Sequence, residues 1–339
     1  MRPFAYERAG DAALAARHAT AQGQTDAPVQ FLAGGTTLID LMKLDVLRPD
    51  RVVDITPLKA AHSAIEVGSG GLRLGALATM SAVADHPQVL RDHPAIAQSM
   101  ALAASPQLRN MATLGGNVLQ RTRCPYYRDP SWGECNKRKP GSGCAAIKGF
   151  NRQNAVLGVS DQCIAQYPGD FGVVLAALEA EIEVAGPGGT RRMPFRALHR
   201  DASQPHLEHT LHPGEVILAF RIPGGPLARH SLYLKIRDRQ SYEFAIASAA
   251  VALDIRGGVV RAARIGLGGS TYRPWRAEAA ETSLVGKPLT ETTAHAAADL
   301  ALRGAVTHGH NDYKPELVRR TVVRALMQVA ALPSTNGEA

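Results

Sequence analysis

The chain has 339 residues, of which 45% are hydrophobic and 20% are charged, which is the balance of a folded protein with a buried core. This composition excludes a largely disordered chain, and the length is sufficient for two domains. No stretch approaches about 18 uninterrupted apolar residues, so we expect no membrane-spanning helix. The N-terminal residues also lack an apolar run, and we expect no signal peptide there.

The net charge of +8 is concentrated in one segment, residues 121–152, which also contains three of the four cysteines. A positive charge would permit nucleic-acid binding, but aromatic residues make up only 5% of the chain and leave little for base stacking. The basic residues of the segment are Arg121, Arg123, Arg128, Lys137, Arg138, Lys139, Lys148 and Arg152, and its acidic residues are Asp129 and Glu134.

The N-terminal part of the chain predicts a compact α/β unit. A Gly-Gly-Thr-Thr turn at 34–37 separates a strand from a helix, and Thr36 or Thr37 is expected to be the N-cap of that helix. The expected elements are an alanine-rich helix over 11–22, a strand over 29–33, a helix over 38–44 and a strand over 51–55.

The middle of the chain predicts two hairpins and several helices. Residues 121–154 lack periodicity and are rich in proline and glycine, so we expect an irregular segment there. The expected hairpins join 65–67 to 72–74 and 181–184 to 190–193, and the expected helices cover 171–180 and 78–104, the latter in two pieces broken near Pro94.

A domain boundary is expected near Pro223-Gly224-Gly225-Pro226. The segment beyond it predicts a small antiparallel meander followed by two helices, so the whole chain is expected to be an α+β protein. The strands are expected over 231–237, 247–255 and 259–266, and the helices over 292–304 and 315–331.

Two elements combine glycine with hydroxyl side chains. The first runs from Phe31 to Leu38, and its backbone N–H groups can approach a pyrophosphate closely. The second runs from Ala112 to Val118 and adds Asn117 to a threonine and two glycines. Neither is a GxGxxG or a Walker A sequence. A glycine turn is more often only a turn, so both interpretations stay open from the residues alone.

The only four cysteines are Cys124, Cys135, Cys144 and Cys163. Their spacing lacks the close CxxC pairs of zinc ribbons, and no secretory signal supports two disulfides. A 4Fe–4S cluster would explain the surrounding cations, because four thiolates around such a core leave a net negative charge. From residue types alone, a cluster and a structural zinc are equally supported.

The stretches FLAGGTTLIDLMKL, SPQLRNMATLGGNV and YPGDFGVVLAAL resemble the FAD-binding subunits of molybdenum hydroxylases, a family that includes the medium subunit of carbon monoxide dehydrogenase and the flavin domain of xanthine dehydrogenase. The stretch from Gln120 to Arg152, with DQCIA after it, is similar to the flavin and 4Fe–4S subunit of bacterial periplasmic-type aldehyde oxidoreductase. The resemblance implies a two-part FAD-binding domain of the vanillyl-alcohol-oxidase (PCMH) type over 1–225, with an iron–sulfur insert over 121–165. It also implies a C-terminal domain of the CO dehydrogenase flavoprotein type, with a three-stranded sheet and helices, over 226–333.

The resemblance also assigns binding roles. Asp170 matches an acidic family position on the adenosine side of FAD, although without the resemblance a helix N-cap is the better interpretation. A cation at Lys235 would stabilise reduced flavin, and a solvated strand residue is the equal alternative. The other implied FAD residues are Phe31, Leu32, Ala33, Gly34, Gly35, Thr36, Thr37 and Leu38 at the pyrophosphate, Thr113, Gly116 and Asn117 along the flavin, and Leu218, like Lys235, near the isoalloxazine, while Cys124, Cys135, Cys144 and Cys163 would hold the cluster.

The function implied by the resemblance is electron transfer within a heterotrimeric aldehyde oxidoreductase. Aldehyde would be oxidised at a molybdenum cofactor on a large partner, and electrons would pass through 2Fe–2S centres of a small partner to FAD here and then to an unknown acceptor. The chain would have no catalytic residues for aldehyde and no activity by itself. The complex would work in the cytoplasm, or in the periplasm after co-export with a signal-bearing partner. The alternatives are the flavin subunit of a xanthine or CO dehydrogenase-like enzyme, a zinc-binding variant, a self-contained flavin reductase and a nucleic-acid-binding protein.

Overall fold

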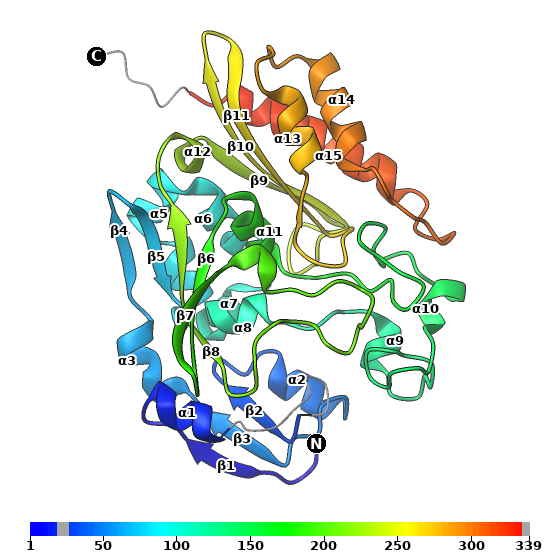
Figure 1. Ribbon diagram of the computed structural model, residues 1–339. Coiled ribbons are helices and arrows are strands. Elements are labelled where there is room, and N and C mark those ends of the chain that lie inside the picture. The colour runs from blue at the N-terminus through cyan, green and yellow to red at the C-terminus, as the bar shows by residue number, and fades with distance from the viewer. Residues whose placement is uncertain (19–26, 334–339) are drawn as a thin grey trace.

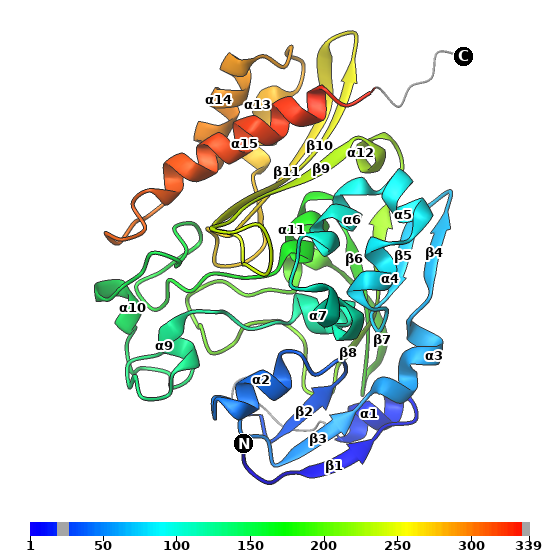
Figure 2. The same cartoon turned by 180° about the vertical axis from the view of Figure 1, so that it is seen from behind.

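Three β-sheets follow one another from the bottom to the top of Figure 1. The structure is a computed structural model that describes residues 1–18 and 27–333. Figures 1 and 2 both show the cysteine-containing segment, with the short helices α9 (Pro125–Arg128) and α10 (Ala145–Lys148), at one side of the molecule. Among the described helices, none combines the length and the apolar character needed to cross a bilayer.

The first sheet forms the predicted α/β unit. Its strands run in the order β1-β3-β2 and are all parallel, with β1 as an edge strand that the sequence analysis did not predict. The expected helix over 11–22 begins at Ala12 and is described as far as His18, and its last predicted residues lie outside the described part. The elements are β1 (Ala5–Arg8), α1 (Ala12–His18), β2 (Val29–Leu32), α2 (Leu38–Lys43) and β3 (Arg51–Asp54), followed by a 3₁₀ turn (Thr56–Leu58) and α3 (Lys59–His62).

The second sheet is antiparallel and contains both predicted hairpins. Strand β8, which the sequence analysis missed, lies between them and gives the order β4-β5-β8-β6-β7. Its apolar side chains, such as Phe220 and Ile222, pack with Phe171 in the largest hydrophobic core. The strands are β4 (Ile65–Gly68), β5 (Gly71–Gly75), β6 (Glu181–Gly186), β7 (Gly189–Pro194) and β8 (Val216–Pro223), and a 3₁₀ turn (Phe195–Ala197) follows β7.

Short helices cover the second sheet (Figure 2). The expected two-piece helix over 78–104 is in fact three helices, because Pro87 and Pro94 each begin a new one at a position that needs no backbone N–H. The second glycine element is also partly helical. The helices are α4 (Met80–Ala84), α5 (Pro87–Asp92), α6 (Pro94–Ala101), α7 (Pro106–Met111), α8 (Leu114–Val118) and α11 (Asp170–Ala177).

The third sheet is the predicted meander with one addition. A short fourth strand, β12, extends the expected three strands, and the order is β12-β11-β10-β9. Helix α15 lies against β9 and β10 and buries the predicted stripe of Val318, Val322, Ala325 and Val329. The elements are α12 (Pro226–Arg229), β9 (Ser231–Ile236), β10 (Ala247–Arg256), β11 (Val259–Gly268), β12 (Trp275–Arg276), α13 (Glu278–Leu284), α14 (Glu291–Ala301) and α15 (Lys314–Ala330).

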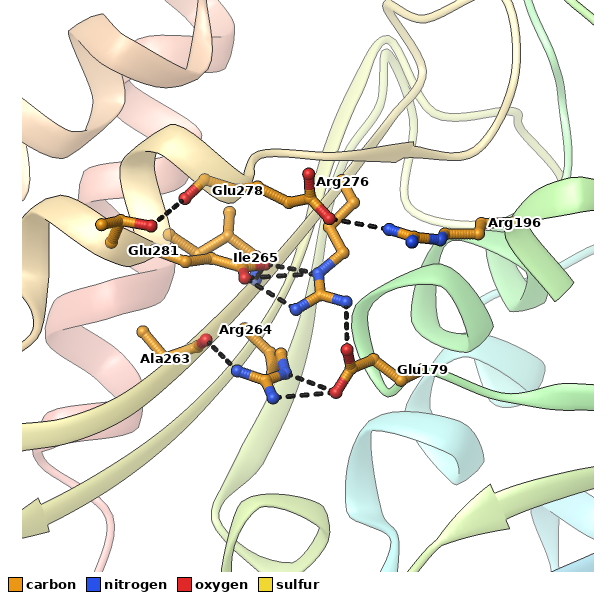
Figure 3. Close-up of polar contacts among 9 residues, drawn as sticks. Glu179, Arg196, Ala263, Arg264, Ile265, Arg276, Glu278 and Glu281 are labelled. Atoms are coloured by element: carbon orange, nitrogen blue, oxygen red, sulfur yellow. Dashed lines mark hydrogen bonds and ion pairs between the residues drawn. The ribbon is translucent and has the colours of Figure 1, made fainter. Parts of the chain in front are cut away.

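An ionic network joins the second and third sheets (Figure 3). Glu179, which follows α11, accepts hydrogen bonds from Arg264 at 2.8 Å and from Arg276 at 2.6 Å. Arg276 also forms a bidentate pair with Glu281 of α13, whose carboxylate accepts the backbone N–H of Ile265 at 2.8 Å. Arg276 and Glu281 are 11% and 7% exposed, so this part of the network is shielded from solvent.

Replacing Arg276 by methionine is expected to lower the free energy of unfolding by about 3 kcal/mol, because it leaves the buried Glu281 carboxylate without its cation. Urea denaturation monitored by fluorescence measures this loss. The matched control is Arg196→Met, which removes a cation from the exposed pair with Glu278 in the same network and should change stability by less than about 1 kcal/mol. Equal effects of the two substitutions would contradict the assigned burial.

Candidate functional site

The two glycine elements border a long cleft made of two adjoining cavities of about 520 Å³ and about 200 Å³. Both cavities are bordered by Thr36, Thr37 and Gly116, so they meet where the two elements face each other. The combined space suits a ligand longer than a single nucleotide. Of the residues expected to bind FAD, those that line the cleft are Phe31, Ala33, Gly34, Gly35, Thr36, Thr37, Leu38, Thr113, Gly116, Asn117 and Asp170.

The first glycine element touches the chain just before the second one. A Cβ atom on Gly34 would lie 1.9 Å from the carbonyl oxygen of Met111, so only glycine permits this approach. Gly35 has φ +74°, and a Cβ atom there would lie 3.2 Å from the side chain of Ile39 and 3.3 Å from that of Leu32. Gly34 therefore sets the spacing of the two glycine elements, and Gly35 allows the backbone conformation of the turn.

Polar groups of both elements are left available to a ligand in the cleft. Thr37 is the N-cap of α2, as expected, but among the described residues its side chain makes no capping hydrogen bond. Thr113 does cap α8, accepting the N–H of Gly116 at 3.4 Å. The Oδ1 atom of Asn117 is buried and has no hydrogen-bond partner in the described part of the chain. An unsatisfied buried acceptor is costly, which indicates that a ligand donates to it.

Asp170 lines the larger cavity, and its charge is neutralised by a buried lysine. Its carboxylate accepts hydrogen bonds from the Tyr233 hydroxyl at 2.5 Å and from Nζ of Lys235 at 2.8 Å. Lys235 also donates to the carbonyl of Leu102, and its side chain is 1% exposed, so the solvated alternative is wrong. The N-cap of α11 is Gly169, so the N-cap interpretation of Asp170 is wrong as well.

Three expected FAD residues do not border the described cavities. Lys235 reaches the cleft only through Asp170. Leu32 packs against a hydrophobic cluster with Leu41 and Met42, and Leu218 lies on β8, where its carbonyl accepts the N–H of Ala76 at 2.9 Å.

Several residues that the sequence analysis did not select also line the larger cavity. Tyr242 and Phe244 lie at its mouth and are 57% and 38% exposed. The Arg123 guanidinium lies 4.9 Å from the centre of the Phe244 ring. Their only sequence signal is an aromatic pair in a polar loop, which is too weak to predict a site. The other unselected lining residues include Asp40, Met80, Leu108, Gln120 and Arg128.

The four cysteines, spread over 40 residues, lie together beside the cleft. None of them forms a disulfide. Cys135 and Cys144 face each other in an antiparallel bridge, and the thiols of Cys144 and Cys163 share a hydrogen bond. Cys124 packs against clusters that contain Cys135 and Cys163. In the described chain, no group of three or more His, Cys, Asp or Glu side chains is arranged to hold a single metal ion.

Hydrogen-bond donors surround the sulfur atoms. The Asn154 side chain donates to Sγ of Cys124 at 3.6 Å, and the N–H of Ala165 donates to Sγ of Cys163 at 3.4 Å. Tyr127 packs in the hydrophobic cluster that contains Cys135, and its hydroxyl is buried without a partner among the described residues. Such donors stabilise thiolates and inorganic sulfide, so the donor set fits an iron–sulfur group.

The basic segment is neutralised by carboxylates from other parts of the chain. Asp40 of α2 binds Arg128 in a bidentate pair at 2.9 and 3.1 Å and also accepts from Arg123 at 3.2 Å. Although partial burial works in the opposite direction, these arginines hold the pKa of Asp40 below its usual range. Glu208 pairs with Lys137 and Arg121, and Asp238 pairs with Arg152.

The rest of the segment also differs from an exposed basic patch. Arg138 donates to backbone carbonyls of Tyr126, Tyr127 and Trp132. Lys139 and Lys148 are exposed, and no described residue forms an ion pair with either. Most of the positive charge of the segment is therefore paired within the fold, which removes the main argument for nucleic-acid binding.

The chain matches two protein-family models that together span most of its length. Residues 2–225 match the FAD-binding domain in molybdopterin dehydrogenase, and residues 232–329 match the CO dehydrogenase flavoprotein C-terminal domain. The chain is 41% identical over 334 residues to the aldehyde oxidoreductase FAD-binding subunit PaoB of Escherichia coli, covering 98% of this chain and 99% of that protein.

More distant relatives also match the chain over most of its length. The carbon monoxide dehydrogenase medium chain of Hydrogenophaga pseudoflava is 26% identical, and the match covers 90% of each chain. A solved structure of carbon monoxide dehydrogenase from the same organism superposes with a TM-score of 0.75 at 25% identity, covering 98% of this chain and 99% of that one.

Replacing Asp40 by asparagine is expected to lower the free energy of unfolding by about 1 kcal/mol, since the lost carboxylate is partly exposed. It should also loosen the cysteine segment, because Arg123 and Arg128 then repel each other. Limited trypsinolysis after the exposed Lys148 should become faster. The matched control is Asp45→Asn, which removes an exposed carboxylate paired with Arg2 and Arg48 at the end of α2 and should leave the cleavage rate unchanged. Faster cleavage in both variants would show that Asp40 does not hold the segment.

Proposed function

Because the chain belongs to the FAD-binding subunits of the molybdopterin dehydrogenase family, we propose that it passes electrons through bound FAD out of a complex that oxidises an aldehyde on another chain. The aldehyde is proposed from the relative that is 41% identical over nearly the full length of both chains. The large partner would carry the molybdenum cofactor, and a small partner would carry 2Fe–2S centres. In this proposal the chain is not active towards aldehyde by itself.

The observation that carries the FAD proposal is the pairing of both glycine elements across one cleft, with an unsatisfied acceptor between them. The Thr36 and Thr37 hydroxyls and the N–H groups of the first element would bind the pyrophosphate. The buried Oδ1 of Asn117 would accept from the ligand. FAD, when bound, supplies the exchange between two-electron and one-electron transfer.

The residues below the cleft would control charge at the cofactor. Lys235 neutralises Asp170, so Asp170 can accept a hydrogen bond from the ligand without adding net charge to a closed site. Asp170 thereby becomes a positioning group for polar atoms of FAD. Lys235 would act on the flavin through Asp170 rather than by direct contact, which changes the role that the resemblance implied.

We further propose that Cys124, Cys135, Cys144 and Cys163 hold a 4Fe–4S cluster. In such a cluster each iron takes one thiolate, so the four sulfur atoms need not surround a single ion. The N–H donors around the sulfur atoms support the same group. A zinc-binding variant remains the alternative, and it would require the four sulfur atoms to close around one ion.

The position of Cys124 beside the cleft supports electron transfer between the cluster and FAD. Cys124 lines a cavity of about 40 Å³ that shares Arg123, Pro168 and Phe244 with the larger cavity of the cleft. We therefore propose that the cluster exchanges electrons with FAD. We propose that the complex works in the cytoplasm, or in the periplasm after co-export with a signal-bearing partner.

Replacing Asn117 by leucine is expected to weaken FAD binding roughly tenfold, through loss of one buried hydrogen bond. The folded chain without FAD should lose little stability, because Oδ1 has no partner in the described structure and Nδ2 donates only to Sδ of Met80, at 3.4 Å. In the purified complex, aldehyde should still bleach the 2Fe–2S centres of the partner while reduction of an external dye falls with FAD content. Xanthine or CO as the active substrate in place of aldehyde would support the alternative molybdenum hydroxylases.

The control is Asn110→Leu, the same exchange at an exposed position of α7 outside the cleft, which should keep full FAD content. Retention of FAD in Asn117→Leu at wild-type affinity would overturn the assignment of Asn117. A complex that forms without this chain and reduces the dye at full rate would overturn the proposed function.

Anaerobically purified protein is expected to contain about four iron atoms and about four acid-labile sulfides per chain. Cys135→Ser should lower both sharply, because a hydroxyl is a poor replacement for thiolate on iron. Ser142→Ala is the control: its hydroxyl accepts the N–H of Cys135 at 3.0 Å, so the variant disturbs the same loop without removing a thiolate, and iron should be retained. One zinc per chain with no iron or sulfide would contradict the cluster.

A further inference from the structure

Beside the cysteines lies a buried group of three charges, Arg121, Lys137 and Glu208. One carboxylate oxygen of Glu208 lies 2.7 Å from Nζ of Lys137, and the other lies 3.2 Å from Arg121. The three side chains are between 6% and 16% exposed. Burying three ionised groups is costly compared with apolar side chains of similar size, so packing alone does not account for them.

Lys137 is the member of this group nearest the cysteines. It follows Cys135 by two residues, and its Nζ also donates to the carbonyl of Pro205 at 3.2 Å. Its ammonium lies 5.0 Å from the centre of the Tyr272 ring, and Tyr272 packs in one cluster with Cys163. The ammonium therefore belongs to a residue close to Cys135 in sequence and lies beside the cluster that contains Cys163.

Glu208 is shared between two cations, because Arg121, on the wall of the cleft, holds its second oxygen. Replacing Lys137 by a neutral residue would leave the ion pair of Arg121 and Glu208 in place. The lysine is thus a charge that the local fold can lose without leaving the carboxylate unpaired.

We propose that Lys137 is a positioning residue for electron transfer, whose ammonium, held by Glu208, raises the reduction potential of the group bound by the four cysteines. This inference rests on the proposed cluster. Reduction adds one electron and thus one negative charge to that group, and a fixed cation beside it in a site of low dielectric stabilises the reduced form more than the oxidised form. The electron would come from the reduced flavin in the adjacent cleft.

The test is a redox titration of the anaerobically purified full chain, followed by the electron paramagnetic resonance signal of the reduced cluster. Lys137→Met and Lys137→Gln should each make reduction about tenfold less favourable, which for one electron lowers the midpoint potential by about 59 mV. Lys137→Arg, which keeps the charge, should stay close to wild type. Lys139→Met is the matched control, because this lysine is exposed and follows Lys137 by only two residues.

The outcomes separate the two proposals. Wild-type protein without iron would defeat the proposed cluster and this inference together. Iron present in all variants with unchanged midpoints would overturn only the role of Lys137. Loss of iron from both neutral variants, with iron kept in Lys137→Arg, would also overturn it, because Lys137 would then be a structural residue. A lowered midpoint in Lys137→Met or Lys137→Gln, absent from Lys139→Met, supports the inference.

Discussion

A segment with eight basic and two acidic residues cannot pack onto the body of a protein unless carboxylates from elsewhere meet it. Here Asp40, Glu208 and Asp238 do so, each from a different part of the chain. The segment has little hydrophobic periodicity of its own, and its two helices are single turns. Charge neutralisation from outside is therefore what fixes where the segment lies.

The position of these carboxylates brings the two candidate cofactor sites together. Asp40 belongs to the helix that begins at the first glycine element, so its pairs with Arg123 and Arg128 connect the cleft to the residues on either side of Cys124. Asp238 adds a link to the loop after β9, which also supplies the aromatic mouth of the cleft. The same ion pairs thus organise the FAD site and the cysteine site.

Local patterns predicted the elements that depend on neighbours in sequence. Both hairpins, the strands β2 and β3 and the helix α15 follow from alternation, turn residues and the apolar stripe. Strand β8 was missed because its place between two hairpins depends on pairing with residues far away in the chain. Helix α8 was missed because its two glycines suggest a loop, whereas the Thr113 cap starts a helix there.

In the site, too, the local motifs were predicted and the contacts between distant parts of the chain were not. Glycine turns and cysteines are visible as motifs, and most of the expected FAD residues do line one cleft. The ionic partners of the segment were not predictable, since no pattern gives Asp40 or Glu208 an ionic role and they lie more than 65 residues from the lysine or arginine they bind. Lys235 shows the same limit, because a basic residue on a strand gives no sign that Asp170 will cover it.

The contact of Gly34 with the carbonyl of Met111 has a consequence for how the cleft is built. The distance between the two glycine elements is set by backbone against backbone, and no side chain rotation can widen it. The width of the cleft at this contact is therefore fixed when the chain folds. A ligand whose thickness matches this width binds without a change in the distance between the two glycine elements. Differences in affinity among ligands of one thickness then arise from the polar groups along the walls.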